Sequence, residues 1–175
     1  MALPIPNPRT FIASEVEVAA YFNAIRDAIN FMTNRPRVVL YQATAQAMAN
    51  ATWTAVSLDT TLLDNYGSHS NSTNNSRFIA QVAGWHRAAG GVGFVSAAAG
   101  AGRGAGFYKN GSPYTAGTSV VGNSGNIHVT PVSQDVYLNV GDYLELAGWQ
   151  NSGGNLNSNG SGQYASWLSV CWEGN

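Results

Sequence analysis

The chain has 175 residues, a mass of 18.4 kDa and a net charge of −1, from 8 basic and 9 acidic side chains. This length suits one domain, and a hydrophobic fraction of 45% is enough to form a buried core. Charged residues make up only 10% of the chain, against about 25% in an average soluble domain. That composition argues against a nucleic-acid binder that works by neutralising phosphates and against charge-driven disorder.

The N-terminal segment is predicted to be an extended arm followed by one helix. Prolines at positions 4, 6 and 8 disfavour a helix there, and a capping box of Ser14 and Glu17 then favours a helix start. Asn34 and Pro36 end the helix. Its apolar residues are spaced four, three, four and three, as in a heptad seam: Val18, Phe22, Ile25, Ile29 and Met32. This seam either packs on the chain's own domain, mediates self-association or docks in a groove of another protein.

The sequence also predicts how the chain relates to membranes and to secretion. No basic stretch followed by an apolar run opens it, so we expect no signal peptide. No window approaches ~18 uninterrupted apolar residues, so we expect no membrane insertion. Cys171 is the single cysteine, which excludes a disulfide within one chain. We therefore expect a protein that stays in the cell where it is made, or leaves inside a particle released by lysis.

From Arg37 onward the apolar period changes to two, which is typical of strands. Ten strands are predicted, at 37–43, 53–60, 77–82, 92–97, 104–109, 119–121, 126–131, 134–140, 143–150 and 164–172. Turn residues separate them, and the pair Asn110 and Gly111 is a strong hairpin signal because both tolerate positive φ. Many short strands without a second helix predict an all-β sandwich or jelly roll. We divide the chain into an anchoring arm and helix, 1–36, and a β domain, 37–175.

Three blocks of the β domain, read in order, carry a family resemblance. They are RFIAQVAGW at 77–85, GFYKNG at 106–111 and VYLNVGDYLEL at 136–146, with WLSV following at 167–170. Together they resemble the C1q/TNF-like jelly roll, with its phenylalanine strand and Val-x-Gly-aromatic corner, its Lys-Asn-Gly hairpin and its Gly-Asp turn between two strands. The resemblance implies a sandwich of about ten strands that forms a homotrimer around a three-fold axis. It further implies apolar and aromatic interfaces, in which Tyr137 and Tyr143 would lie.

A second resemblance lies in the N-terminal segment. The sequence IPNPRTF at 5–11, followed by a helix containing Asn23, Arg26 and Asp27, is similar to the leader of small virion proteins of actinobacterial phages and prophages. Those proteins place such an arm before a C1q-like domain. The resemblance implies a non-enzymatic bacteriophage structural protein, a capsid decoration protein, head fibre or minor tail protein. In such a protein, residues 1–36 would bind another virion protein of the capsid or tail, and the jelly roll would be displayed on the particle surface. Virions assemble in the host cytoplasm, which accounts for the missing signal peptide.

Metal binding has to be considered for two histidines and three acids. His69 and His128 could each form a metal site where three copies meet on a trimer axis, and a solvated or hydrogen-bonded histidine is the alternative. The carboxylates of Asp59, Asp64 and Asp142 could contribute to calcium sites or could serve as turn and cap groups. The sequence has no dense acidic cluster. We therefore predict no metal site.

Two further motifs are expected to have no catalytic role. The stretch GAGRGA at 100–105 formally matches a dinucleotide fingerprint, but a strand-like run follows it where a helix is required. Cys171 lies in an apolar run, which predicts a buried structural thiol. We expect no catalytic residue and no cofactor.

Three aromatic residues remain as candidates for contact with a ligand. Trp85, Tyr114 and Trp149 are predicted at strand ends beside polar loops, where aromatic faces with Asn, Gln and Gly neighbours suit a sugar-binding surface. Core filling and trimer packing are the alternative roles. These residues support a second hypothesis, in which the chain is a receptor-binding module of the phage tail that attaches to a host-surface glycan.

Overall fold

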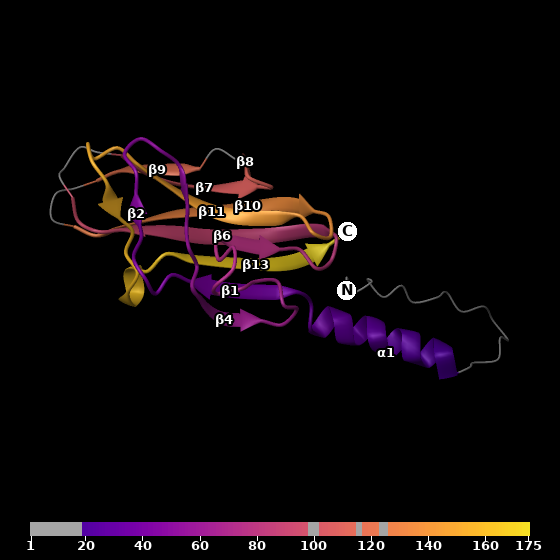
Figure 1. Ribbon diagram of the computed structural model, residues 1–175. Coiled ribbons are helices and arrows are strands. Elements are labelled where there is room, and N and C mark those ends of the chain that lie inside the picture. The colour runs from indigo at the N-terminus through magenta and orange to yellow at the C-terminus, as the bar shows by residue number, and fades with distance from the viewer. Residues whose placement is uncertain (1–18, 98–101, 115–116, 123–125) are drawn as a thin grey trace.

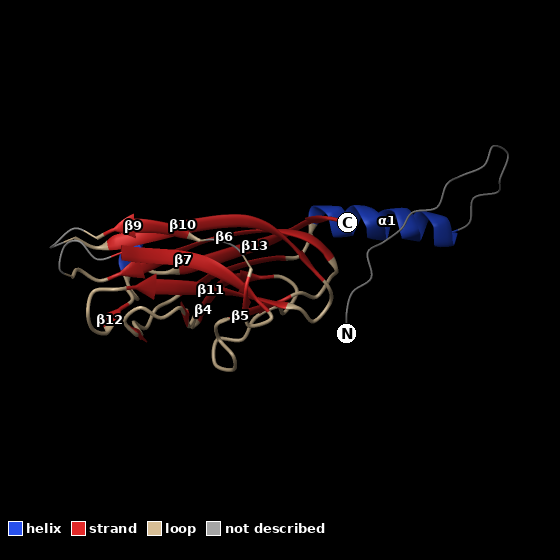
Figure 2. Cartoon of the chain, turned by 90° about the horizontal axis from the view of Figure 1, so that it is seen from above, coloured by secondary structure: helices blue, strands red, loops and turns tan. Residues whose placement is uncertain are grey.

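The computed structural model describes residues 19–97, 102–114, 117–122 and 126–175. Two facing β-sheets form a sandwich, and one helix extends from its end (Figures 1 and 2). The five-stranded sheet has the order β10 (His128–Leu138), β6 (Gly84–Phe94), β13 (Trp167–Gly174), β1 (Arg37–Tyr41) and β4 (Thr60–Asp64). The other sheet comprises β3 (Thr54–Ala55), β11 (Tyr143–Gln150), β7 (Gly102–Lys109), β8 (Ser112–Pro113), β5 (Arg77–Ile79) and β9 (Thr118–Val121).

Three short elements complete the described chain. Strands β2 (Ala47–Met48) and β12 (Leu156–Asn157) pair with each other, and residues Gly162–Tyr164 form a 3-10 turn before β13. The helix α1 spans Ala19–Thr33. In the part of the chain that the structure describes, no helix has the length and apolar character needed to cross a bilayer.

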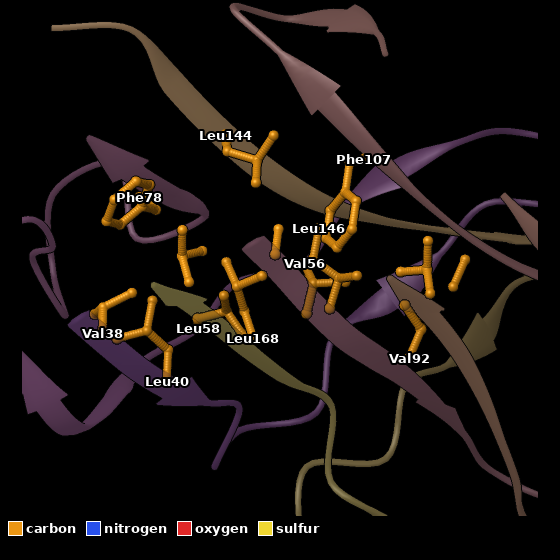
Figure 3. Packing of buried hydrophobic residues seen from close by; sticks show 14 of the residues in the cluster. Val38, Leu40, Val56, Leu58, Phe78, Val92, Phe107, Leu144, Leu146 and Leu168 are labelled. Atoms are coloured by element: carbon orange, nitrogen blue, oxygen red, sulfur yellow. The ribbon is translucent and has the colours of Figure 1, made fainter. Parts of the chain in front are cut away.

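The core lies between the two sheets and follows from the alternation of side chains along the strands (Figure 3). Leu40 of β1 and Leu168 of β13 point inward from one sheet, while Phe107 of β7 and Leu146 of β11 point inward from the other. All four side chains are fully or almost fully buried. The predicted all-β jelly roll with one short helix is confirmed.

Several strand predictions were wrong. The predicted strand 53–60 is a strand only in β3 and at Thr60, where β4 begins, and two further differences have a clear physical reason. The predicted strands 126–131 and 134–140 are one strand, β10. It runs through Pro131 because, among the described strands, β10 pairs only with β6 and so lies at the sheet edge, where proline is tolerated. Most of β6 was missed, because alanine and glycine have low strand propensity. These small residues are required by close packing: a Cβ on Gly90 would lie 3.0 Å from the Trp167 carbonyl oxygen and 3.1 Å from Leu146.

Two of the motif blocks meet at one end of the sandwich, in turns that need positive φ. Asn110 and Gly111 have φ of 52° and 77°, and Gly141 has φ of 88°. Asn110 also exchanges two hydrogen bonds with Tyr143: its amide donates to the Tyr143 carbonyl, and its side-chain oxygen accepts from the Tyr143 amide. The hairpin after β7 is thereby joined to the start of β11.

Asp142 strengthens the same junction. Its carboxylate accepts hydrogen bonds from the Asn110 side chain and the Asn139 amide, both at 2.9 Å, and lies 3.2 Å from the Lys109 ammonium. The Asn110 and Asn139 hydrogen bonds, with the Lys109 charge, lower the pKa of Asp142 from its ordinary value to about 2. The Lys-Asn-Gly and Gly-Asp motifs are therefore parts of one structural junction.

Helix α1 is attached to the sandwich by its last two turns. Ala28 and Phe31 are buried, and the Phe31 ring meets Trp172 at 5.0 Å and Tyr66 at 6.4 Å in edge-to-face geometry. Beyond this contact the helix extends past the end of the sandwich (Figures 1 and 2). The predicted boundary between 36 and 37 stays a prediction. Phe31, which precedes it, packs on Tyr66 and Trp172, which follow it.

Candidate functional site

The outer face of the five-stranded sheet carries the most distinctive surface of the molecule. Strand register places one residue from each strand in a row across this face: Leu63, Val39, Ser169, Ala89 and Ser133. Most of these side chains are small, and none of them is fully buried by the described chain. The row is therefore a flat strip that another protein surface can approach closely.

A second row on this face combines an aromatic wall with a hollow. Tyr41, Trp167, Gly91 and Pro131 follow one another across the four strands. Beside Trp167, which is 38% exposed, lies a hollow of about 340 Å³ that is also lined by Ala89, Pro131 and Thr118. An apolar side chain of a partner can enter this hollow.

Charges on the same face are largely compensated. Arg87 lies 3.2 Å from Asp135, and Arg35 lies 3.6 Å from Glu173. The hydrogen bond and charge of Asp135 raise the pKa of Arg87. Arg37 makes no ion pair with any residue that the structure describes. The face therefore has little net charge to repel a second copy.

The outer face of the six-stranded sheet is different because the chain covers it with its own side chains. A Cβ on Gly104 or Gly106 would lie 3.3–3.4 Å from the Trp53 ring, so Trp53 lies directly over these glycines. Ala147 shares this face and is 0% exposed. Trp149 stands beside Gly102, and the Trp53 ring remains 40% exposed.

The structure places two of the three predicted glycan-contact residues in one region and the third on the other sheet. Trp85 is 47% exposed at one end of the five-stranded sheet and packs edge-to-face on Tyr137 at 5.6 Å. Tyr114 reaches the same region, where its hydroxyl donates to the Asp135 carbonyl. Trp149 lies on the other sheet beside Trp53. Tyr137 and Trp53 lie beside these residues but carry no signal for this in the sequence, because their partners are distant in sequence and only strand register brings them together.

The predicted helix seam is exposed where it is described. Phe22, Ile29 and Met32 are 59%, 54% and 74% exposed, and Ile25 is half-buried. Val18 lies outside the described residues. The predicted interface aromatics divide between the sheets: Tyr137 is 40% exposed on the five-stranded sheet, and Tyr143 of β11 is half-buried.

The structure places the candidate metal ligands in separate local networks. Both ring nitrogens of His69 lie 2.8 Å from backbone carbonyl oxygens, those of Arg77 and Leu58, so neither is free to bind a metal. His128 is half-buried on β10, opposite Phe94. Among the residues that the structure describes, no three His, Cys, Asp or Glu side chains converge as a metal site would require.

The three candidate calcium carboxylates bind backbone amides in turns. Asp59 accepts from the amides of Ala43 and Thr44, and Asp64 accepts from three amides of its own loop. Burial raises the pKa of Asp59, but these hydrogen bonds outweigh it and the net pKa is lowered. Asp142 closes its turn in the same way. The turn and cap role is confirmed.

The remaining two motifs also have assigned positions. In the GAGRGA stretch, residues 102–105 belong to strand β7, while 100 and 101 lie outside the described residues. The prediction of a buried thiol at Cys171 was wrong: it is half-buried on the outer face between Arg37 and Arg87. Strand alternation turns Leu168 and Val170 inward, so Cys171 points outward.

One buried histidine was not singled out from the sequence. His86 of β6 is 1% exposed, its Nδ1 donates to the Gly84 carbonyl, and its ring contacts Phe78. Its Nε2 is buried and has no hydrogen-bond partner among the described residues. Burial lowers the pKa of His86, and the Gly84 hydrogen bond opposes this only in part. A neutral core histidine is the result.

Comparison with known proteins agrees with this geometry. No protein-family model and no curated protein matches the sequence. Among solved structures, the globular domain of zebrafish complement 1qA aligns with a TM-score of 0.60 and 10% identity, over 81% of this chain and 100% of that chain. Murine APRIL aligns with 0.56 and 12%, over 78% and 98%, and Eiger TNF from S. frugiperda with 0.52 and 8%, over 81% and 96%. The chain therefore has the C1q/TNF-like jelly-roll fold.

Proposed function

We propose that this protein is a non-enzymatic structural component of a bacteriophage virion. Three copies assemble through the outer face of the five-stranded sheet. Residues 1–36 attach the trimer to a capsid or tail protein, and the jelly roll is displayed on the particle as a decoration protein, head fibre or minor tail protein. Assembly takes place in the host cytoplasm, before the particle is released.

The trimer is carried by one observation, the uncovered row Leu63, Val39, Ser169, Ala89 and Ser133 on a face with compensated charge. Small side chains on a sheet let a second β-layer approach to about 10 Å. The hollow beside Trp167 offers a place for an apolar side chain from the neighbour. The resemblance to C1q/TNF-like domains supports three as the number of copies.

The virion role is supported by the N-terminal resemblance to phage virion proteins and by the position of α1. The helix extends beyond the sandwich (Figure 1), so it projects away from the displayed domain. A chain with 10% charged residues also suits a compact shell of identical subunits, since it carries little charge to cause repulsion.

Two measurements test the proposal. Size-exclusion chromatography with light scattering should give three times the chain mass of 18.4 kDa, and a monomer at about micromolar concentration would contradict it. For attachment, residues 1–18 are deleted, because a cut after α1 would remove Phe31 from Trp172. The shortened chain should remain trimeric and fail to enter particles; if it enters them as well as the full chain, those residues do not attach the trimer.

A second function is favoured by Trp53 and Trp149. In the assembly proposed above, both remain on the outward sheet, with the Trp53 ring lying on glycines and 40% exposed. Such a ring can stack on the apolar face of a sugar. In this alternative the displayed domain is a receptor-binding module that attaches the tail to a host-surface glycan, and Trp149 is its contact residue.

A further inference from the structure

Helix α1 exposes an apolar stripe that its own domain does not cover. Phe22, Ile29 and Met32 are more than half exposed, and Ile25 lies between them on the same side of the helix. Large apolar side chains gathered on one surface indicate an interaction site. The spacing of three, four and three places Phe22 and Ile29 at heptad position a, and Ile25 and Met32 at position d.

The stripe is separate from the side that attaches the helix to the sandwich. Ala28 and Phe31 make that attachment, and at 3.6 residues per turn they are centred about 110° around the helix from the stripe. The stripe can therefore be covered by another molecule without detaching the helix.

The residues of the stripe favour three copies. Isoleucine at both a and d positions shifts a parallel coiled coil from dimers toward trimers and tetramers, and here Ile29 occupies a and Ile25 occupies d. The ionised side chains described on α1 are Arg26 and Asp27, which pair with each other at 2.8 Å. Copies of the helix therefore bring no unbalanced charge together.

The stripe is also continuous with the face that joins the subunits. Met32 lines a hollow of about 550 Å³ together with Leu63 and Arg37. Leu63 is the first residue of the row that runs through Val39, Ser169, Ala89 and Ser133, and Arg37 lies on the same outer face of the five-stranded sheet. In a ring with three-fold symmetry equivalent helices cannot run antiparallel, and each leaves its sandwich at the same end (Figure 2).

We propose that residues 19–33 of three copies form a parallel three-helix coiled coil with Phe22, Ile25, Ile29 and Met32 as its seam. This inference rests on the trimer proposed above. A helix of 15 residues is too short to associate alone, but the jelly rolls hold the helices at high effective concentration. The apolar stripes of the three helices then cover one another, so residues 1–18 are the part of the segment that attaches to the particle.

Cysteine cross-linking in the full chain tests the coiled coil. Ile25→Cys is compared with Asn30→Cys, which lies at position b and points away from the seam, both in a Cys171→Ser background because Cys171 is only half-buried. After mild oxidation, Ile25→Cys should give a disulfide-linked dimer on a denaturing gel, since two of three cysteines on the axis can join. Asn30→Cys should stay unlinked.

Light scattering on the same samples separates the two proposals. Trimers in which Ile25→Cys is linked no better than Asn30→Cys would overturn the coiled coil and leave the trimer intact. Monomers would overturn the trimer itself. As a second readout, Ile29→Lys should weaken trimer association in dilution experiments and leave the jelly roll folded; unchanged association would also overturn the coiled coil.

Discussion

The two outer faces of the sandwich both carry small residues, but the chain covers these residues with its own side chains on one face and leaves them open on the other. On the six-stranded sheet, Trp53 covers Gly104 and Gly106, and Ala147 is 0% exposed. On the five-stranded sheet, Ala89 occupies an equivalent central position and is left partly exposed by its own chain. Small residues on a sheet face thus have two different consequences, depending on whether the same chain supplies the cover.

This difference indicates which face of the sandwich would meet a second copy in the proposed trimer. A sheet face covered by its own tryptophan has already buried its apolar area. An uncovered apolar strip is stabilised only when a partner removes it from water. We therefore expect substitutions on the five-stranded face to change assembly and substitutions on the six-stranded face to change ligand contact.

The largest effect is expected for Ala89→Arg. Three charged side chains would be placed in the interface without partners, which is strongly unfavourable, so the trimer should dissociate to folded monomers at about micromolar concentration. Light scattering and circular dichroism check this. Ser119→Arg is the matched control, since Ser119 is an exposed strand residue of the other sheet, and it should remain trimeric. Equal behaviour of the two variants would remove the distinction between the faces.

The next effect concerns the junction between the hairpin after β7 and the turn before β11, at one end of the sandwich. Asp142→Asn should lower the free energy of unfolding by on the order of 2 kcal/mol at pH 7, since the folded state lowers the pKa of Asp142 to about 2. The folded pKa is below the unfolded one, so this stabilisation is present above pH 3.8 and is lost as pH falls towards 2.

Denaturant unfolding at several pH values measures this difference. Asp27→Asn is the control, because its ion pair with Arg26 is exposed on α1 and such pairs contribute little. A variant at Asp142 that is as stable as the Asp27 variant at pH 7 would show that the junction is not held by this carboxylate.

A smaller effect distinguishes the faces by ligand binding. In the carbohydrate-binding alternative, Trp149→Ala should weaken binding of a host cell-wall polysaccharide by about tenfold, or ~1.4 kcal/mol, and Trp53→Ala should act in the same direction. Trp85→Ala, on the other sheet, should leave binding unchanged. Calorimetric titration of the folded trimer measures this, and loss with Trp85→Ala alone would move the contact to the opposite face.

The smallest effect is the pH dependence contributed by His86, which lies between the sheets. Its folded pKa is lowered by burial, so the unfolded state takes up the proton first and stability falls as pH decreases below about 6.5. His86→Leu should flatten this slope between pH 7.5 and 5.5 in denaturant unfolding, without changing the number of subunits. An identical slope in both proteins would show that His86 does not titrate on unfolding.

Parts of the fold could be predicted from the sequence because their signals are local. The α1 helix follows from the spacing of Phe22, Ile25, Ile29 and Met32, and the turns follow from Asn110, Gly111 and Gly141, which alone can supply positive φ cheaply. The order of the motif blocks predicted the jelly roll, and the protein has that fold.

Other features could not be predicted because they depend on contacts between distant strands. Strand β6 is rich in glycine and alanine and is a strand because β10 and β13 pair with it on both sides. The candidate residues Trp85 and Trp149 were predicted as one group, and register assigned them to opposite sheets, beside Tyr137 and Trp53. The outward position of Cys171 likewise depends on which face of β13 meets the core.

The sequence by itself determined the elements whose causes lie within a few residues: the seam of the helix, the turns, the alternation of the strands, and a surface with few charges. Only the tertiary structure decided which small residues Trp53 covers and which remain open on the five-stranded sheet. The physical reason is that burial is a property of non-local packing. Alternation shows that a residue faces one side of a sheet, but the side that meets the core, and the chain that covers the other side, depend on pairing across the whole fold.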